Sequence, residues 1–250
     1  MKTFQDVFKT PKPIIGVLHL KGASDEEVKE RAKREVAAYL EGGVDALLAE
    51  DYFGTYDQLA WLLEYLLTHR PNVPVGVNCL NFDSLNFELA RQYGCDFLQL
   101  DSVIGHVKPR DEASMKAFLA KEEARTDALV LGGVRFKYQP VLSAHTLAED
   151  LQEAKRRCGA VCVTGDATGA QTPLDKLKEF RSLLGDFPLV ICSGLTAENC
   201  VEQLQIADAA VVGSYFKDTG KDTGDVSPAK VRTLMEKVKM LRWQDKPSRL

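Results

Sequence analysis

The segment PLVICSGLTAEN, residues 188–199, contains a short apolar run that stops at a small residue and a glycine and then opens a helix. The segment DAAVVGSYFKDTG, residues 208–220, repeats this arrangement. Short apolar runs without strict alternation are typical of strands buried on both faces of a parallel sheet. The two segments therefore predict consecutive strand–helix units.

Six further runs rich in branched apolar residues precede these two. The eight predicted strands cover residues 14–20, 44–50, 75–80, 97–101, 128–135, 161–165, 189–194 and 209–214. Amphipathic segments between them carry helix-start and helix-end signals. The starts are capping boxes at Ser24, Thr55 and Thr146 and prolines Pro173 and Pro228 at the first helical position, and the ends are Gly42, Gly43, Gly94, Gly159 and Gly185.

Eight strand–helix units in 250 residues, with no linker between them, predict one α/β domain folded as a closed (β/α)8 (TIM) barrel. We expect a short extension over residues 1–12, with the segment MKTFQDVF outside the barrel, and a tail over residues 243–250. A doubly wound open sheet is the alternative, but VLHLKGAS lacks the GxGxxG turn that such a dinucleotide fold needs. The sequence has no GxxxxGK[ST] phosphate loop either.

Composition narrows the class of protein. The chain is 45% hydrophobic and 27% charged, with a formal net charge of −4 and no block of Lys or Arg, so we expect no nucleic-acid partner. No signal peptide and no apolar run of membrane-spanning length are found, which predicts a cytoplasmic protein. We expect a homo-oligomer. Peripheral membrane association stays open.

Six cysteines are present, and none forms a CxxC pair. Most fall in predicted strands or helices, where a thiol packs as a small apolar group. We interpret them as inert, with a structural zinc site or a disulfide framework as the alternative.

The ends of the seventh and eighth strands predict a phosphate site. In barrels the active site lies at the carboxyl ends of the strands, and phosphate groups often lie beyond strands seven and eight. Ser193 and Gly194 end the seventh run, and Gly213 and Ser214 end the eighth. Glycine lets backbone N–H groups approach an anion closely. The alternative is that each glycine only permits a tight turn.

Polar residues also end the other six strands. A charged group is costly in a barrel wall but useful at its mouth, so their convergence predicts a functional site. These residues are His19, Glu50, Asn78, Asp101, Arg135 and Thr164, with Asp51, Lys137, Gly165 and Asp166 just beyond.

Glu50 and Asp101 are the expected acid/base pair, and they can also hold a divalent cation through oxygen ligands. A buried ion pair with Arg135 is the alternative. We expect Glu50, Asn78 and Asp101 to share one pocket. His19 can assist proton transfer or serve only as a hydrogen-bonded core residue.

A lysine, two loops and the remaining histidines also bear on the site. Lys137 is a candidate for Schiff-base chemistry, although pairing with a phosphate or carboxylate suits its position past the strand better. The loop VTGDATGAQTP, with Asp166 and Thr168, can wrap a ligand or only connect two elements. The loop YFKDTGKDTGDVSP is expected to be a mobile lid. His69 and His145 fit surface positions, whereas His106 can reach over the mouth.

The segments KPIIGVLHL, VDALLAEDYFG, VPVGVNCLN, VTGDATGAQTP, CSGLTAEN and DAAVVGSYFKDTG together resemble the BtpA family of photosystem I biogenesis-like proteins. The resemblance covers most of the chain and implies a phosphate-binding (β/α)8 barrel, with some members linked to photosystem assembly. It implies a fold and a phosphate site more firmly than a reaction.

Two segments depart from the family pattern. The first loop, HLKGASDEE, is shorter than usual, and strand five reads GGVRFKY where the family tends to carry Asp and His near the lysine, so only Lys137 keeps its counterpart. The chain is also similar to phosphoribosyl isomerases, which are ribulose-phosphate-binding barrels. Their acid and base end strands one and five, where this chain has His19 and Arg135, and arginine is too basic to exchange a proton.

Two functions follow from these observations. The first is an isomerase, lyase or aldolase that acts on a small phosphorylated, sugar-like metabolite, with a divalent metal as an optional cofactor. The second is a non-catalytic assembly factor for a membrane complex that keeps the barrel as a scaffold. The fold alone does not decide between them.

Overall fold

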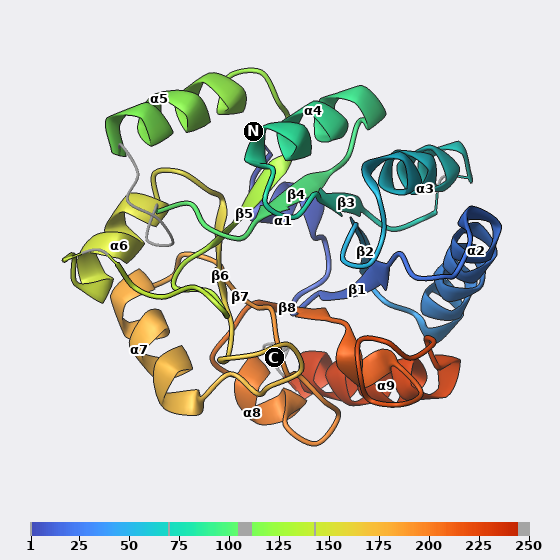
Figure 1. Cartoon of the computed structure of the whole chain (residues 1–250). Coiled ribbons are helices and arrows are strands. Elements are labelled where there is room, and N and C mark those ends of the chain that lie inside the picture. The colour runs from blue at the N-terminus through green and yellow to red at the C-terminus, as the bar shows by residue number, and fades with distance from the viewer. Residues whose placement is uncertain (1, 70, 105–111, 143, 245–250) are drawn as a thin grey trace.

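Eight parallel strands close into a barrel in the order β1-β2-β3-β4-β5-β6-β7-β8, and β1 pairs with β8. The computed structural model describes residues 2–69, 71–104, 112–142 and 144–244. The closed order of the eight parallel strands confirms the predicted (β/α)8 barrel. Viewed along the barrel axis, helices α2 to α9 surround the strands (Figure 1).

Seven of the eight strands lie inside the runs predicted from sequence, and β6 begins one residue before its predicted run. The strands are β1 (Ile14–His19), β2 (Ala46–Glu50), β3 (Val75–Asn78), β4 (Phe97–Leu100), β5 (Leu129–Gly133), β6 (Ala160–Val163), β7 (Leu189–Ile191) and β8 (Ala209–Val212). The helices are α1 (Phe4–Val7), α2 (Asp25–Gly42), α3 (Tyr56–His69), α4 (Asp83–Tyr93), α5 (Glu112–Glu123), α6 (Leu147–Ala154), α7 (Leu174–Leu184), α8 (Cys200–Leu204) and α9 (Pro228–Gln244), with a 3-10 turn, η1 (Ser214–Phe216). Residues 243 and 244, expected in the tail, belong to α9.

Two apolar clusters hold the barrel together. Alternate residues of each strand face inward or outward, as the period of two requires. Inward residues such as Ile15, Leu48 and Leu131 form the cluster inside the barrel. Outward residues such as Leu18 and Val130 pack with the buried faces of the surrounding helices.

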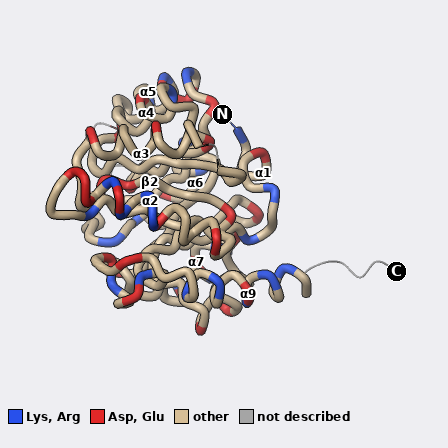
Figure 2. Tube along the Cα trace, turned by 90° about the vertical axis from the view of Figure 1, so that its right-hand side faces the viewer, with Lys and Arg blue, Asp and Glu red and all other residues tan. Residues whose placement is uncertain are grey.

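Helix α1 supplies no strand to the barrel but closes its amino-terminal end, so the extension over residues 1–12 packs against the inner cluster. Phe4, Val7 and Phe8 are buried and belong to the inner cluster. The ring of Phe8 lies 5.5 Å from that of Phe97 on β4. In the side view, α1 and the end of α9 lie on the same side of the molecule (Figure 2). Lys and Arg are interspersed with Asp and Glu along the trace in this view.

Most helix-start signals take their expected form. Thr55 and Thr146 form reciprocal capping boxes with Gln58 and Glu149. Ser24 accepts a hydrogen bond from the N–H of Glu27. Pro228 is the first residue of α9, whereas Pro173 precedes α7 as its N-cap.

Glycines end α2, α4 and α7 with positive φ at Gly43, Gly94 and Gly185. Gly159 does not end a helix, because α6 stops at Ala154. A Cβ at Gly159 would lie 2.4 Å from Cδ1 of Leu129, so close packing against β5 accounts for this glycine.

The loop between η1 and α9 is tied to α2. Lys217 is fully buried, and its Nζ donates to both carboxylate oxygens of Glu35 on α2, each at 2.8 Å. Arg31 Nη2 donates to the carbonyl of Thr223 at 3.2 Å. The loop expected to be a mobile lid is therefore held against α2, and its mobility stays a prediction.

Within the described residues, no helix is long and apolar enough to span a membrane. All six cysteines are buried with free thiols, so the chain has no disulfide framework.

Candidate functional site

A cavity of about 160 Å³ opens at the carboxyl end of the barrel. It brings together residues from strands on both sides of the axis. The polar lining includes His19, Glu50, Gln99, Lys137, Thr168, Ser193, Thr196 and Ser214, with Gly194 and Gly213 between them. Part of the predicted catalytic group and the predicted phosphate site thus share one cavity.

Glu50, Asn78 and Asp101 form a hydrogen-bonded group at the ends of β2, β3 and β4. Asn78 Nδ2 donates to Glu50 Oε2 at 2.9 Å and lies 3.4 Å from Asp101 Oδ1. Glu50 lines the cavity, whereas Asn78 and Asp101 stand behind it. Asp51, next in the chain, accepts the N–H of Leu80 at 2.8 Å and so fixes the loop after β3.

Burial controls the protonation of this group. Removal from water, with repulsion from Asp101 as the second cause, raises the pKa of Glu50 to about 7. Burial also raises the pKa of Asp101. The positive charge of Lys137 opposes both changes. Glu50 can therefore gain and lose a proton near neutrality, as a general acid or base must.

His19 lies beside Glu50 as a neutral group. Its Nε2 is 3.6 Å from Glu50 Oε1, and its Nδ1 is 3.5 Å from the carbonyl oxygen of Asp222. Burial, reinforced by the charge of Lys217, lowers the pKa of His19 to about 3. The ring stacks on Tyr52 with centroids 5.0 Å apart. A neutral imidazole can share a proton with Glu50 without forming an ion pair.

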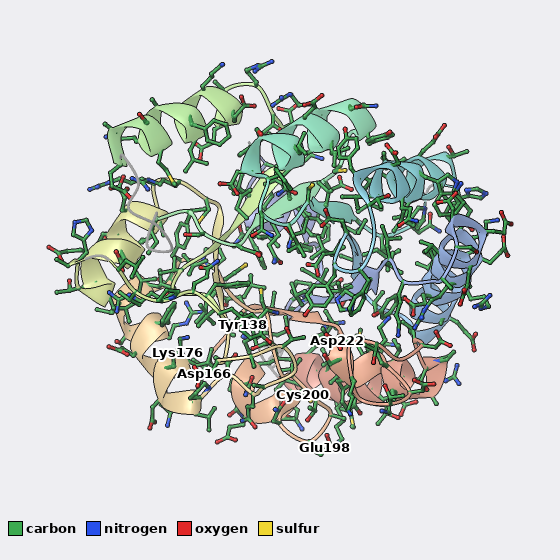
Figure 3. All side chains as sticks on the ribbon, in the orientation of Figure 1. Tyr138, Asp166, Lys176, Glu198, Cys200 and Asp222 are labelled. Atoms are coloured by element: carbon green, nitrogen blue, oxygen red, sulfur yellow. The ribbon has the colours of Figure 1, made fainter. Side chains whose placement is uncertain are left out.

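Loops from opposite sides of the barrel meet over the cavity. The hydroxyl of Tyr52 lies 3.5 Å from Thr168 Oγ1, and the N–H of Thr168 donates to the hydroxyl of Tyr138 at 2.9 Å. Tyr138, Asp166 and Asp222 mark the loops after β5, β6 and β8, which lie in the lower half of the view in Figure 3. These contacts join the loops after β2, β5 and β6 beside the cavity lining at Thr168.

The two small-residue strand ends differ in their surroundings. Gly194 has φ +68°, and a Cβ there would lie 2.3 Å from the carbonyl of Ala170, so packing alone requires this glycine. A Cβ at Gly213 would lie 3.3 Å from His19 Cε1. The Ser193 hydroxyl accepts the N–H of Gly165 at 2.7 Å. Gly213 and Ser214 are consequently the more available ligand contacts.

Arg135 does not pair with Glu50 or Asp101, so the ion pair considered from sequence is not formed. It lies past the end of β5 with φ +47°, and its side chain is turned outward. Arg135 Nε donates to Asp150 Oδ2, and Nη2 donates to the carbonyl of His145, each at 2.9 Å.

The other predicted residues lie outside the lining of the cavity. Thr164 is buried, and its hydroxyl accepts the N–H of Lys137 at 2.6 Å. Asp166 is exposed and lies with Lys176 in a separate shallow groove. His69 and His145 are exposed as expected, and His106 lies outside the described residues.

Sequence reasoning missed two polar residues. Gln99 interrupts the apolar strand FLQL and shares the inward face with Phe97, so a period of two marks it. Glu35 lies in the buried stripe of α2, between Ala32 and Val36 in the chain, and this charge in an apolar stripe signals a buried partner such as Lys217.

A metal site has partial support. Glu50 and Asp101 supply carboxylate oxygens, but the described residues contain no group of three or more His, Cys, Asp or Glu side chains that could hold a metal ion. We therefore assign no metal-dependent step.

The fold and the cavity define a (β/α)8 barrel protein with a polar site at the carboxyl ends of its strands. The sequence model of the BtpA family matches residues 10–240, and the chain belongs to this family. An uncharacterized protein of Pyrococcus abyssi is 28% identical, over 92% of this chain and 97% of its own. The photosystem I biogenesis protein BtpA of Synechocystis is 26% identical, over 94% of this chain and 91% of its own.

Solved structures with the same fold are more distant in sequence. A structure described as native KDPGal has a TM-score of 0.64 at 13% identity and covers 92% of this chain and 95% of its own. Phosphoribosyl anthranilate isomerase in complex with reduced 1-(o-carboxyphenylamino)-1-deoxyribulose 5-phosphate has a TM-score of 0.60 at 13% identity, covering 92% and 99%. At this identity the likeness shows the fold alone.

Proposed function

We propose that the chain is an enzyme that acts on a small phosphorylated, sugar-like metabolite by proton transfer. One observation carries the proposal: a single cavity holds both a carboxyl group that titrates near neutrality, Glu50, and the open strand ends at Gly213 and Ser214. The structural neighbour that binds a ribulose 5-phosphate derivative supports the substrate class by analogy.

Each residue has a role that follows from its position in the cavity. The phosphate lies at Gly213 and Ser214, where backbone N–H groups and a hydroxyl can donate to it. Glu50 removes or delivers a proton on the carbon skeleton, and neutral His19 shares hydrogen bonds with Glu50 and the substrate oxygen. Lys137 stabilises negative charge that develops on that oxygen. This division serves an isomerase or a lyase.

A scaffold role in membrane-complex assembly is the second candidate, and the Synechocystis relative, a photosystem I biogenesis protein, favours it. Burying a titratable carboxyl costs stability, and a scaffold gains nothing from that cost. The cavity chemistry therefore favours the enzyme.

Phosphate binding is tested by calorimetry on a matched pair of variants. Ser214→Asp adds a negative charge to the proposed anion site, whereas Ser214→Asn has the same size without the charge. We expect Ser214→Asp to weaken inorganic phosphate binding by about 2 kcal/mol, the scale of a charge-assisted hydrogen bond, and Ser214→Asn to weaken it much less. Equal affinity in the wild type and both variants would overturn the phosphate site.

Proton transfer is tested separately by NMR in D2O with a panel of aldose and ketose phosphates. The wild type should exchange a carbon-bound hydrogen of at least one compound for deuterium, and Glu50→Gln should lose this exchange. If phosphate binds but no compound exchanges, the scaffold role is favoured.

A further inference from the structure

The Gln99 side chain has one satisfied end and one unsatisfied end. The residue is 4% exposed and lines the cavity from β4. Its Nε2 donates to Asp101 Oδ1 at 3.3 Å. Its Oε1 is buried without a hydrogen-bond partner among the described residues. A buried acceptor without a partner costs free energy, so such an atom in a binding cavity calls for a ligand donor.

The orientation of the amide follows from its neighbour. Nε2 of Gln99 faces Asp101 Oδ1 and donates to it, so the amide oxygen is the end left for a ligand. The strand fixes the direction of the whole side chain. Gln99 is the register partner of Leu131, an inward residue of β5, and two positions earlier Phe97 also faces inward.

The charges nearby select the kind of donor. Lys137 lines the same cavity and already places one positive charge close to Glu50 and Asp101. A donor without charge leaves this balance of one ammonium and two carboxyl groups unchanged. A fully ionised phosphate has acceptor oxygens and no donor, so it cannot satisfy Gln99. The remaining donor of suitable size is a hydroxyl group.

We propose that Gln99 is a specificity-determining residue that accepts a hydrogen bond from a hydroxyl of a phosphorylated polyol or sugar. The inference rests on the proposed function, because the phosphate must be held at Gly213 and Ser214 for the carbon chain to extend toward β4. It adds that the ligand is hydroxylated along this chain, which distinguishes it from an unsubstituted alkyl phosphate.

The test compares inorganic phosphate, n-pentyl phosphate and D-arabinitol 5-phosphate by calorimetry. The wild type should bind D-arabinitol 5-phosphate at least tenfold more tightly than n-pentyl phosphate. Gln99→Met, which keeps the length and removes the acceptor, should remove this preference and leave the affinity for inorganic phosphate unchanged. Gln203→Met is the matched control, because Gln203 also has a buried unpaired Oε1 but lies on α8 outside the cavity lining.

The outcomes separate the two proposals. If inorganic phosphate binds but the wild type does not prefer the hydroxylated compound, or Gln99→Met keeps the preference, the role of Gln99 is overturned and the phosphate site stands. If neither inorganic phosphate nor either organic phosphate binds the wild type, both proposals fail. Circular dichroism and the Gln203→Met variant exclude loss of folding as the cause.

Discussion

His19 and Glu50 are register partners on adjacent strands, and His19 Nε2 lies 3.6 Å from Glu50 Oε1. Burial moves their pKa values in opposite directions, to about 3 for His19 and about 7 for Glu50. Each group is pushed toward its neutral form, because the charged form is the one that loses hydration. The barrel mouth thus holds a neutral pair in which only Glu50 titrates near physiological pH.

Glu50 should make the fold less stable as pH rises. Its folded pKa of about 7 exceeds the ordinary glutamate value of 4.5, so the folded state binds more protons than the unfolded state between these values. The stabilising effect of the bound proton is complete below pH 4.5 and lost as pH rises through 7. Glu50→Gln lacks this effect, so its stability relative to the wild type should increase by about 3 kcal/mol between pH 4 and pH 8.

Urea unfolding at several pH values measures this difference. Glu236→Gln is the control, because Glu236 is exposed on α9 and its change should leave the curve parallel to that of the wild type. Parallel curves for Glu50→Gln would show that Glu50 is not neutralised by burial.

His19 should have the opposite effect on stability. Its folded pKa of about 3 is below the ordinary histidine value of 6.5, so its contribution to the free energy of unfolding is present above pH 6.5 and lost as pH falls toward 3. Between pH 7 and pH 4.5 the free energy of unfolding of the wild type should fall by about 3 kcal/mol more than that of His19→Gln. Chemical unfolding at these two pH values checks it, with exposed His69→Gln as the control. An equal loss in wild type and His19→Gln would contradict the prediction.

The Lys217–Glu35 pair should be strongly coupled. Lys217→Met removes the closer of two cations from the buried Glu35 carboxylate and leaves only Arg31, at 3.4 Å, so we expect a loss of about 3 kcal/mol in the free energy of unfolding. Lys217→Met combined with Glu35→Leu removes both charges and should recover most of that loss. Urea denaturation of the two single variants and the double variant completes the cycle. If the losses of the two single variants sum to the loss of the double variant, the pair is not coupled.

The sequence was sufficient to predict the barrel because each strand repeats the same local pattern. Apolar runs such as LVI at β7 and AAVV at β8 end in small residues before a helix, and the caps at Thr55 and Thr146 agree with them. The local sequence preferences agree with the overall fold, and this agreement is what allows the fold to be predicted from the sequence.

The candidate site was less predictable, because side-chain direction depends on where each strand stops. Arg135 was placed at the end of strand five, but β5 ends at Gly133, and the positive φ at Arg135 turns its side chain toward α6. Gln99 was missed because it lies within an apolar strand and not at its end. Helix α1 covers the barrel because three apolar side chains in a short segment need burial, a tertiary effect that periodicity does not show.

Replacement by alanine should cost different amounts of stability at the glycines that follow β7 and β8. At Gly194, the positive φ and the Ala170 backbone 2.3 Å from a new Cβ both oppose the change, so Gly194→Ala should lose about 3 kcal/mol or more. At Gly213 the nearest atom is His19 Cε1 at 3.3 Å, and we expect a loss of about 1 kcal/mol. Urea unfolding followed by circular dichroism measures both. Equal losses, or a larger loss at Gly213, would mean that the approach of Ala170 does not determine the residue type at Gly194.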